Sequence, residues 1–222
     1  VDVASKFLVT GTGRSGTSLV MQLLTACGAD TGYAGPFKTW YMPNMGGMDR
    51  DLHTKMTPEE VAELPSVVKD PRACRRLPHL LANGIYKPDH VIVCVRDIRE
   101  ATLSFMSANN IWYPDDPDDP DSFRMGSVEG VGLQNPYTHI SDWLRQVLGS
   151  LLETLVVHDI PFTTVAFPRF VSEPDYLERR LYESGVFDAD DGLSYFCPVQ
   201  TFRKTFSVYA NTDNVNLWTD EK

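Results

Sequence analysis

The most constraining feature of the chain is a glycine-rich turn close to its start. An apolar segment typical of a buried strand, residues 6–10, runs into Gly11-Thr-Gly-Arg-Ser-Gly-Thr-Ser18, and a helical apolar pattern follows over 19–24. The glycines allow a tight turn and a close approach of the backbone to a ligand. The amides and the positive dipole end of the following helix then favour an anion. The pattern predicts a P-loop-like phosphate site, with Thr17 in the position of the P-loop lysine.

Strands and helices are expected to alternate along the rest of the chain. A cap residue and a proline start a helix at Thr57-Pro58, and Asp70-Pro71 and Ser172-Glu-Pro-Asp175 resemble further helix starts. Such alternation indicates βαβ units, and therefore an α/β fold of three layers around a central parallel sheet. We expect one domain over residues 1–222. The remaining strands are expected at 66–69, 90–95 and 162–166, and the remaining helices at 58–64, 72–82, up to about 107, 139–157 and up to 183.

Composition excludes several classes of function. The chain has 20 Lys and Arg against 30 Asp and Glu, a net charge of −10, which argues against a broad basic face for nucleic acid. No apolar run approaches the roughly 18 residues of a membrane span, and no secretory signal pattern opens the sequence. The four cysteines are scattered, and no His, Cys and Asp cluster has metal spacing. We therefore expect a cytoplasmic protein without a metal.

A second polar motif follows the clearest strand, 90–95. Arg96 stands at its carboxyl end, where ligands of open α/β sheets bind, and Ser104 lies on the next helix. Alone, Arg96 and Asp97 would fit a surface ion pair of little energetic value. Combined with the glycine-rich turn, Arg96 and Ser104 predict a second phosphate clamp.

At these motifs the chain resembles the sulfotransferases that use 3′-phosphoadenosine 5′-phosphosulfate (PAPS). Gly13-Arg-Ser-Gly-Thr-Ser18 is similar to the family's 5′-phosphosulfate loop. Arg96-Asp-Ile-Arg, with Ser104 eight residues after Arg96, resembles its 3′-phosphate signature, with Ile98 where proline is usual. Val68-Lys-Asp-Pro-Arg72 and the segment 166–175 give weaker similarities, the second without the family's tyrosine and acids.

The resemblance implies a site for PAPS and its product PAP, no metal, and transfer of a sulfuryl group to a hydroxyl or amine. Arg14 would neutralise charge on the bridging oxygen as the sulfuryl group leaves. Arg96 and Ser104 would hold the 3′-phosphate, a task that suits the charged fork of arginine. The acceptor would be a small molecule or a carbohydrate. The residues implied to hold the 5′-phosphosulfate are Gly13, Arg14, Ser15, Gly16, Thr17 and Ser18.

The group that takes the proton of the acceptor does not come with these motifs. Family members use His or Glu, and this chain has Asp70-Pro71 where cytosolic members keep a His. Asp70 is the leading candidate because it follows strand 66–69, although it equally fits a helix cap. The other candidates are Asp49, His53, Glu59 and Glu60. Met and aromatic residues would line an acceptor pocket or a satellite core: Trp40, Tyr41, Met42, Met45 and Met48.

Two other functions stay open from the sequence. A P-loop nucleotide kinase or NTPase would carry lysine at position 17 and an acidic partner for Mg²⁺, so Thr17 argues against it. A non-catalytic nucleotide-binding protein of the same fold would keep the glycine-rich turn and lack the proton acceptor.

Overall fold

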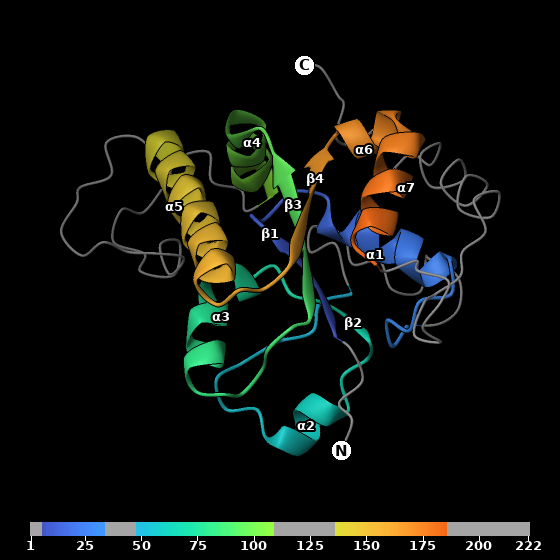
Figure 1. The fold of residues 1–222 in the computed structure, drawn as a ribbon. Helices are drawn as coiled ribbons and strands as arrows, with labels where there is room; N and C mark the ends of the chain where they lie inside the picture. The colour runs from blue at the N-terminus through green and yellow to red at the C-terminus, as the bar shows by residue number, and fades with distance from the viewer. Residues whose placement is uncertain (1–5, 34–47, 109–135, 186–222) are drawn as a thin grey trace.

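The computed structural model describes residues 6–33, 48–108 and 136–185 (Figure 1). Its strands form one four-stranded sheet in the order β2-β1-β3-β4, and every neighbouring pair is parallel. The predicted α/β fold with a central parallel sheet is therefore confirmed. The strands are β1 (Phe7–Gly11), β2 (Val67–Lys69), β3 (His90–Arg96) and β4 (Phe162–Phe167).

Helices cover both faces of the sheet and give the expected layers (Figure 1). On one face lie α1 (Thr17–Ala26), α6 (Arg169–Ser172) and α7 (Pro174–Glu183). On the other lie α3 (Ala73–Ala82) and α5 (Pro136–Val157). Of the other two, α4 (Ile98–Ala108) follows β3 and packs on α5, and α2 (Pro58–Ala62) precedes β2.

The core divides into two clusters because successive residues of a strand point to opposite faces. Val9 of β1 and Val67 of β2 pack with α1 and α7, whereas Leu8 and Val68 pack with α3 and α5. Parallel strands that are buried on both faces have continuous apolar sequences. The apolar runs at 6–10 and 90–95 therefore predict β1 and β3.

One predicted helix cap agrees with the structure, and two others do not. Thr57 caps α2 through a capping box with Glu60, as predicted. Asp70 does not occupy the cap position of α3, which is Arg72. Ser172 does not cap the last helix either, because it ends the short α6, and α7 begins at Pro174. Proline at the first helical position fixes that start.

Several sequence-based predictions concern residues outside the described ranges. They include Trp40, Tyr41, Met42 and Met45, which are predicted to line an acceptor pocket or a satellite core. Within the part of the chain that is described, no helix has the length and apolar character needed to cross a membrane.

Candidate active site

Two glycines of the turn between β1 and α1 are required by the backbone. Gly16 has a φ of 87°, and a Cβ there would lie 2.7 Å from Phe170 Cζ and 2.8 Å from Phe167 Cδ2. Gly11 has a φ of 150°, and its Cβ would lie 2.1 Å from the Cys94 carbonyl oxygen. The turn is thus pressed against β3 and the end of β4, and side chains at these positions would push it out of place.

The third glycine is not required by packing, and the start of α1 leaves backbone amides available to a ligand. A Cβ at Gly13 would meet only the Phe105 ring, at 3.8 Å, which is ordinary contact. The fold itself therefore does not require glycine at position 13. The first hydrogen bond of α1 runs from Leu19 N to the Gly16 carbonyl oxygen (3.0 Å), so the amides of Thr17 and Ser18 lie before it. Such amides at the positive end of a helix suit an anion.

The hydroxyl of Ser15 shapes the turn. It is buried and donates to the Thr12 carbonyl oxygen at 2.6 Å. Its proton is therefore committed to the loop, and the predicted contact of Ser15 with a phosphate is left to its backbone amide. Thr12 Oγ1 is buried and has no hydrogen-bond partner among the described residues.

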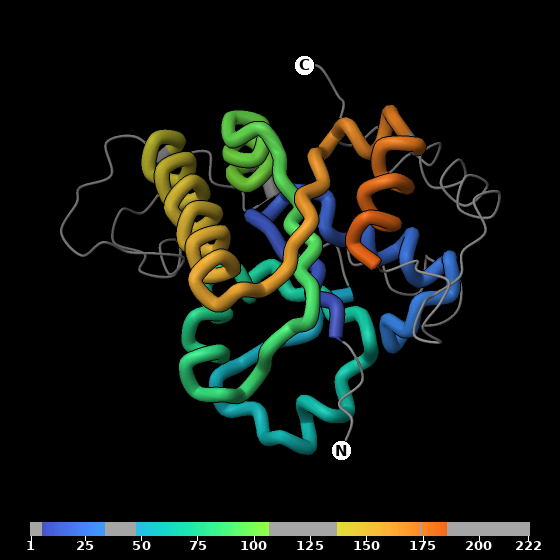
Figure 2. The backbone as a smooth tube through the Cα atoms, viewed as in Figure 1, coloured from blue at the N-terminus to red at the C-terminus, as the bar shows by residue number. Residues whose placement is uncertain are grey.

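Arg14 connects the turn to the second predicted motif. It adopts a left-handed φ of 70°, and its Nε donates to Ser104 Oγ of α4 at 3.2 Å. Figure 2 traces this arrangement, in which the blue turn after β1 passes beside the green end of β3 and α4. The structure therefore brings together Arg14 and Ser104, which are far apart in the sequence.

Arg96 completes this group from the end of β3. Its Nη1 donates to the Arg14 carbonyl oxygen at 3.3 Å, its Nη2 lies 3.6 Å from Glu100 Oε2, and its Cζ lies 4.9 Å from the Phe167 ring centroid. The side chain is only 6% exposed, and its Nε is buried without a hydrogen-bond partner within the described residues. A buried N–H without a partner is costly, so it indicates a place for an acceptor atom.

The charge of Arg96 persists in this environment. Burial lowers the pKa of Arg96, and the nearby charges of Glu100 and Asp97 oppose that shift. Because an arginine side chain starts from a very high pKa, it stays protonated at neutral pH. The site therefore presents a fixed cation beside the glycine-rich turn.

Lys69 and two predicted proton acceptors gather at the end of β2. Lys69 is 1% exposed, and its Nζ contacts Asp49 Oδ1. Burial lowers the pKa of Lys69, and the Asp49 carboxylate opposes that effect. The chain around Asp49 is tied to the same strand end, because Arg50 N donates to the Lys69 carbonyl oxygen at 2.7 Å.

Asp70 is also at this strand end, but its carboxylate faces inward. It is 0% exposed, and its two oxygens accept from Leu52 N (3.1 Å) and Arg72 N (2.8 Å). Burial raises the pKa of Asp70, which the two backbone N–H groups and Arg72 counteract. These contacts favour the structural alternative, in which Asp70 organises the start of α3.

Two of the other predicted proton acceptors lie elsewhere, whereas His53 follows Leu52, whose amide binds Asp70. Glu59 and Glu60 belong to α2, where Glu60 accepts from Thr57 N at 2.8 Å. Because α2 precedes β2, it lies toward the amino end of the parallel strands (Figure 1), opposite the turn after β1. His53 Nδ1 accepts from Lys55 N at 3.2 Å.

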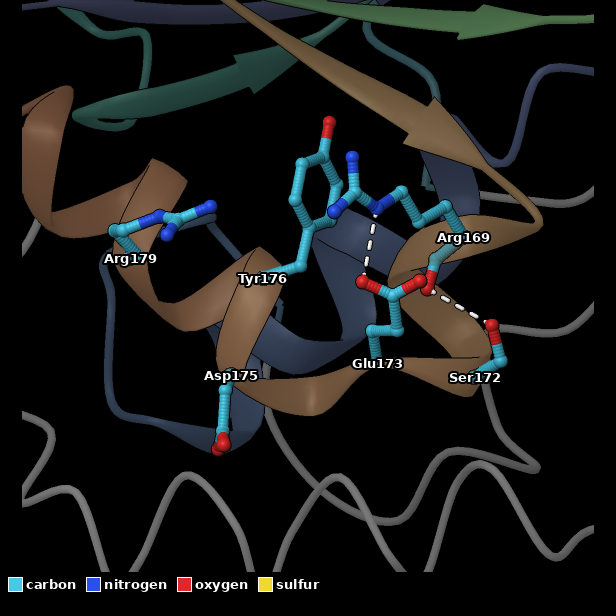
Figure 3. Close-up of a pocket in the computed structure, with 6 residues that line it drawn as sticks. All are labelled: Arg169, Ser172, Glu173, Asp175, Tyr176 and Arg179. Carbon is cyan, nitrogen blue, oxygen red and sulfur yellow. Dashed lines mark hydrogen bonds and ion pairs between the residues drawn. The ribbon is translucent and has the colours of Figure 1, made fainter.

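A separate pocket of about 590 Å³ lies on α6 and α7 (Figure 3). Its cations already have partners: Arg169 Nε donates to Glu173 at 2.9 Å and its Cζ stacks 4.3 Å from the Tyr176 ring centroid. The pocket contains no residue predicted to bind phosphate. Its lining consists of Arg169, Ser172, Glu173, Asp175, Tyr176 and Arg179.

Fold and site together define an α/β protein in which the glycine-rich turn after β1 contacts an arginine at the end of the central strand β3. Residues 4–154 match the family model described as Sulfotransferase domain, and the chain therefore belongs to that family. Sulfuryl transfer from a nucleotide donor to a small-molecule acceptor is the general activity of this family. No curated protein sequence matches the chain significantly. Among the described residues, no group of His, Cys, Asp and Glu is arranged to hold a metal ion.

Proposed function

We propose that the protein is a PAPS-dependent sulfotransferase with a hydroxyl or amine acceptor. The observation that carries the proposal is the meeting of Arg14, Arg96 and Ser104 beside the glycine-rich turn. The buried Arg96 Nε, which has no partner among the described residues, fits a phosphate oxygen. PAPS, when bound, supplies the sulfuryl group, and the 5′-phosphate of PAP is the leaving group.

The turn and its arginine act on the reacting end of the donor. The amides of Ser15, Gly16, Thr17 and Ser18 bind the 5′-phosphosulfate at the start of α1. Arg14 provides a positive charge where negative charge grows on the bridging oxygen, and such preorganised charge lowers the barrier. Ser104 keeps the Arg14 side chain at this end through its hydroxyl (3.2 Å).

Arg96 and Ser104 act on the 3′-phosphate, the group that separates PAP from ADP. The guanidinium of Arg96 is held by the Arg14 carbonyl oxygen and the Phe167 ring. A held fork loses little freedom when it binds an anion. This arrangement supports selection of 3′-phosphorylated nucleotides.

Two residues are candidates to take the proton of the acceptor, Asp70 and Asp49, because both are in contact with the end of β2. The acceptor is a small molecule or carbohydrate in this proposal. We propose one domain over residues 1–222 and a cytoplasmic compartment.

Ligand preference tests the proposal directly. We expect PAP to raise the Tm of the protein more than ADP or ATP with Mg²⁺, because only PAP satisfies Arg96. Release of labelled sulfate from PAPS then tests catalysis. A preference for ATP with Mg²⁺ would favour the kinase alternative and reject the proposal. PAP binding without any turnover of PAPS would favour the non-catalytic alternative.

A further inference from the structure

The end of β2 presents its last residues to opposite faces of the sheet. Lys69 lies in register with Val9 of β1, whose side chain packs toward α1. Asp70 follows on the other side and binds Leu52 N and Arg72 N, toward α3. Lys69 therefore points to the face of the sheet that α1 covers, and α1 carries the proposed anion-binding amides at its start.

Asp49 shares this face and remains open to solvent. Its carboxylate contacts the buried Lys69 ammonium and is 30% exposed, whereas the Asp70 carboxylate is 0% exposed. A buried ammonium requires an anion beside it, so Lys69 fixes the Asp49 carboxylate at the end of β2. Asp49 therefore lies on the face of the sheet that α1 covers and keeps an accessible oxygen.

We infer that Asp49, rather than Asp70, takes the proton of the acceptor, with Lys69 as its positioning residue. The inference rests on the proposed function. In the step, the acceptor O–H bond breaks and its proton passes to an Asp49 carboxylate oxygen. The acceptor oxygen bonds to sulfur as the bond from sulfur to the bridging oxygen breaks. The electron pair of that bond stays on the phosphate, and Asp49 later gives its proton to water.

The charges around Asp49 fit this role. Tyr33 donates to the Asp49 backbone carbonyl at 3.4 Å, and Arg50 lies 5.0 Å from the centroid of the Tyr33 ring. The charge of Asp70, on the other side of the strand end, raises the pKa of Lys69 less than Asp49 does. Asp49 accepts the proton only as the acceptor oxygen becomes bound to sulfur and turns strongly acidic.

The test compares Asp49→Asn with the matched variant Asp70→Asn. Hydrolysis of labelled PAPS in the absence of an acceptor serves as the probe, because water must also lose a proton when it attacks sulfur. We expect Asp49→Asn to lower the hydrolysis rate at least about 100-fold, while the Kd for PAP by calorimetry stays within about threefold. Asp70→Asn should lower the Tm and leave the hydrolysis rate within about fivefold. Asp49→Glu should recover part of the rate.

A second variant keeps the test decisive if Asp49→Asn unfolds, since that change leaves Lys69 without its anion. The double variant Asp49→Asn with Lys69→Met removes both charges, and we expect it to fold and to remain inactive. Hydrolysis within threefold of the wild type in a folded Asp49→Asn protein would overturn the inference. A greater loss of hydrolysis in Asp70→Asn, at unchanged Tm, would also overturn it. Failure of the wild type to bind PAP would instead reject the proposed function.

A spectroscopic measurement tests the ion pair apart from activity. In protein labelled with ¹³C at the lysine ε carbon, the Lys69 signal is assigned by its loss in Lys69→Met. Its titration should move to lower pH in Asp49→Asn, because the carboxylate that favours the charged form is gone. It should move less in Asp70→Asn. An unchanged titration in Asp49→Asn would contradict the pairing and the inference with it.

Discussion

Arg14 Nε donates to Ser104 Oγ at 3.2 Å, and this bond joins the first predicted phosphate motif to the second. Arg96 strengthens the junction by donating to the Arg14 carbonyl oxygen at 3.3 Å. The two motifs therefore form one site in which the conformation of Arg14 depends on β3 and α4. A change in either motif is expected to affect the other. Each variant therefore needs both a turnover rate and a Kd for the nucleotide.

Substitution of Arg14 should act on turnover more than on binding. Arg14→Ala removes the charge at the bridging oxygen, so we expect the rate of sulfate release from PAPS to fall by about 100- to 1,000-fold. The Kd for PAP should rise by less than about tenfold, since the amides of the turn remain. Arg14→Lys keeps a charge and should retain part of the activity. A rate within threefold of the wild type in the alanine variant would exclude Arg14 from the site.

Substitution of Arg96 should act on binding and on nucleotide selectivity. Arg96→Ala removes charge-assisted hydrogen bonds of about 1.5–3 kcal/mol, so the Kd for PAP should rise by about 10- to 100-fold. The Kd for ADP, which lacks the 3′-phosphate, should change little. Calorimetry with both nucleotides measures this, and exposed Arg145, which pairs with Asp142 at 2.8 Å, provides the matched control. Equal losses for PAP and ADP would mean that Arg96 supports the turn only.

Removal of the Glu100 charge should strengthen PAP binding. Glu100 Oε2 lies 3.6 Å from Arg96 Nη2 and competes with the phosphate for this cation. Because Glu100 is 56% exposed, the competition is worth about 0.2–1 kcal/mol. Glu100→Gln should therefore lower the Kd for PAP up to about fivefold and leave that for ADP unchanged. A higher Kd for PAP in this variant would show that Glu100 assists the site.

Two glycines give a matched test of the turn. Gly16 and Gly28 have similar φ values of 87° and 94°, but a Cβ at Gly28 would meet no atom within 4 Å. Alanine at either position costs about 1–2 kcal/mol for the left-handed backbone. Gly16→Ala also clashes with Phe167 and Phe170, which adds about 1–3 kcal/mol. Denaturant unfolding should resolve this difference, and equal losses of stability would contradict the close packing.

Asp70 predicts a pH dependence of stability. Burial raises the pKa of Asp70 above its ordinary value of 3.8, so the folded protein keeps a proton that the unfolded chain has lost. The contribution of Asp70 to stability is therefore complete below pH 3.8 and declines as the pH rises through the folded pKa. Asp70→Asn does not titrate. The free energy of unfolding of the wild type, minus that of Asp70→Asn, should fall over this range, and a rising difference would contradict the assignment.

The sequence was sufficient for the parts of the molecule that depend on local patterns. The apolar runs of β1 and β3 indicate the sheet, and the glycine-rich turn with Arg96 and Ser104 indicates the two motifs that the fold brings into contact. Glycine, proline and alternating apolar residues restrict the backbone over a few positions. The elements that these residues form can therefore be predicted without knowledge of the tertiary fold.

The contacts at the end of β2 depend on the tertiary fold. Asp49 reaches Lys69 across 20 residues of chain, and no local pattern indicates which acid does so. Two signals were nevertheless present: a lysine inside an apolar strand requires an anion, and alternation along β2 directs Lys69 and Asp70 to opposite faces. The short α6 was missed because it spans only Arg169–Ser172.

The contact between Arg96 and Glu100 means that the protein carries a counterion of its own within the phosphate site. An incoming phosphate replaces a carboxylate already in place, so binding exchanges one anion for another and releases few salt ions to the solution. The net charge of −10 also repels a polyanion at long range, and added salt weakens that repulsion. Affinity for PAP should consequently tolerate changes in ionic strength that weaken nucleotide binding to a bare cationic pocket.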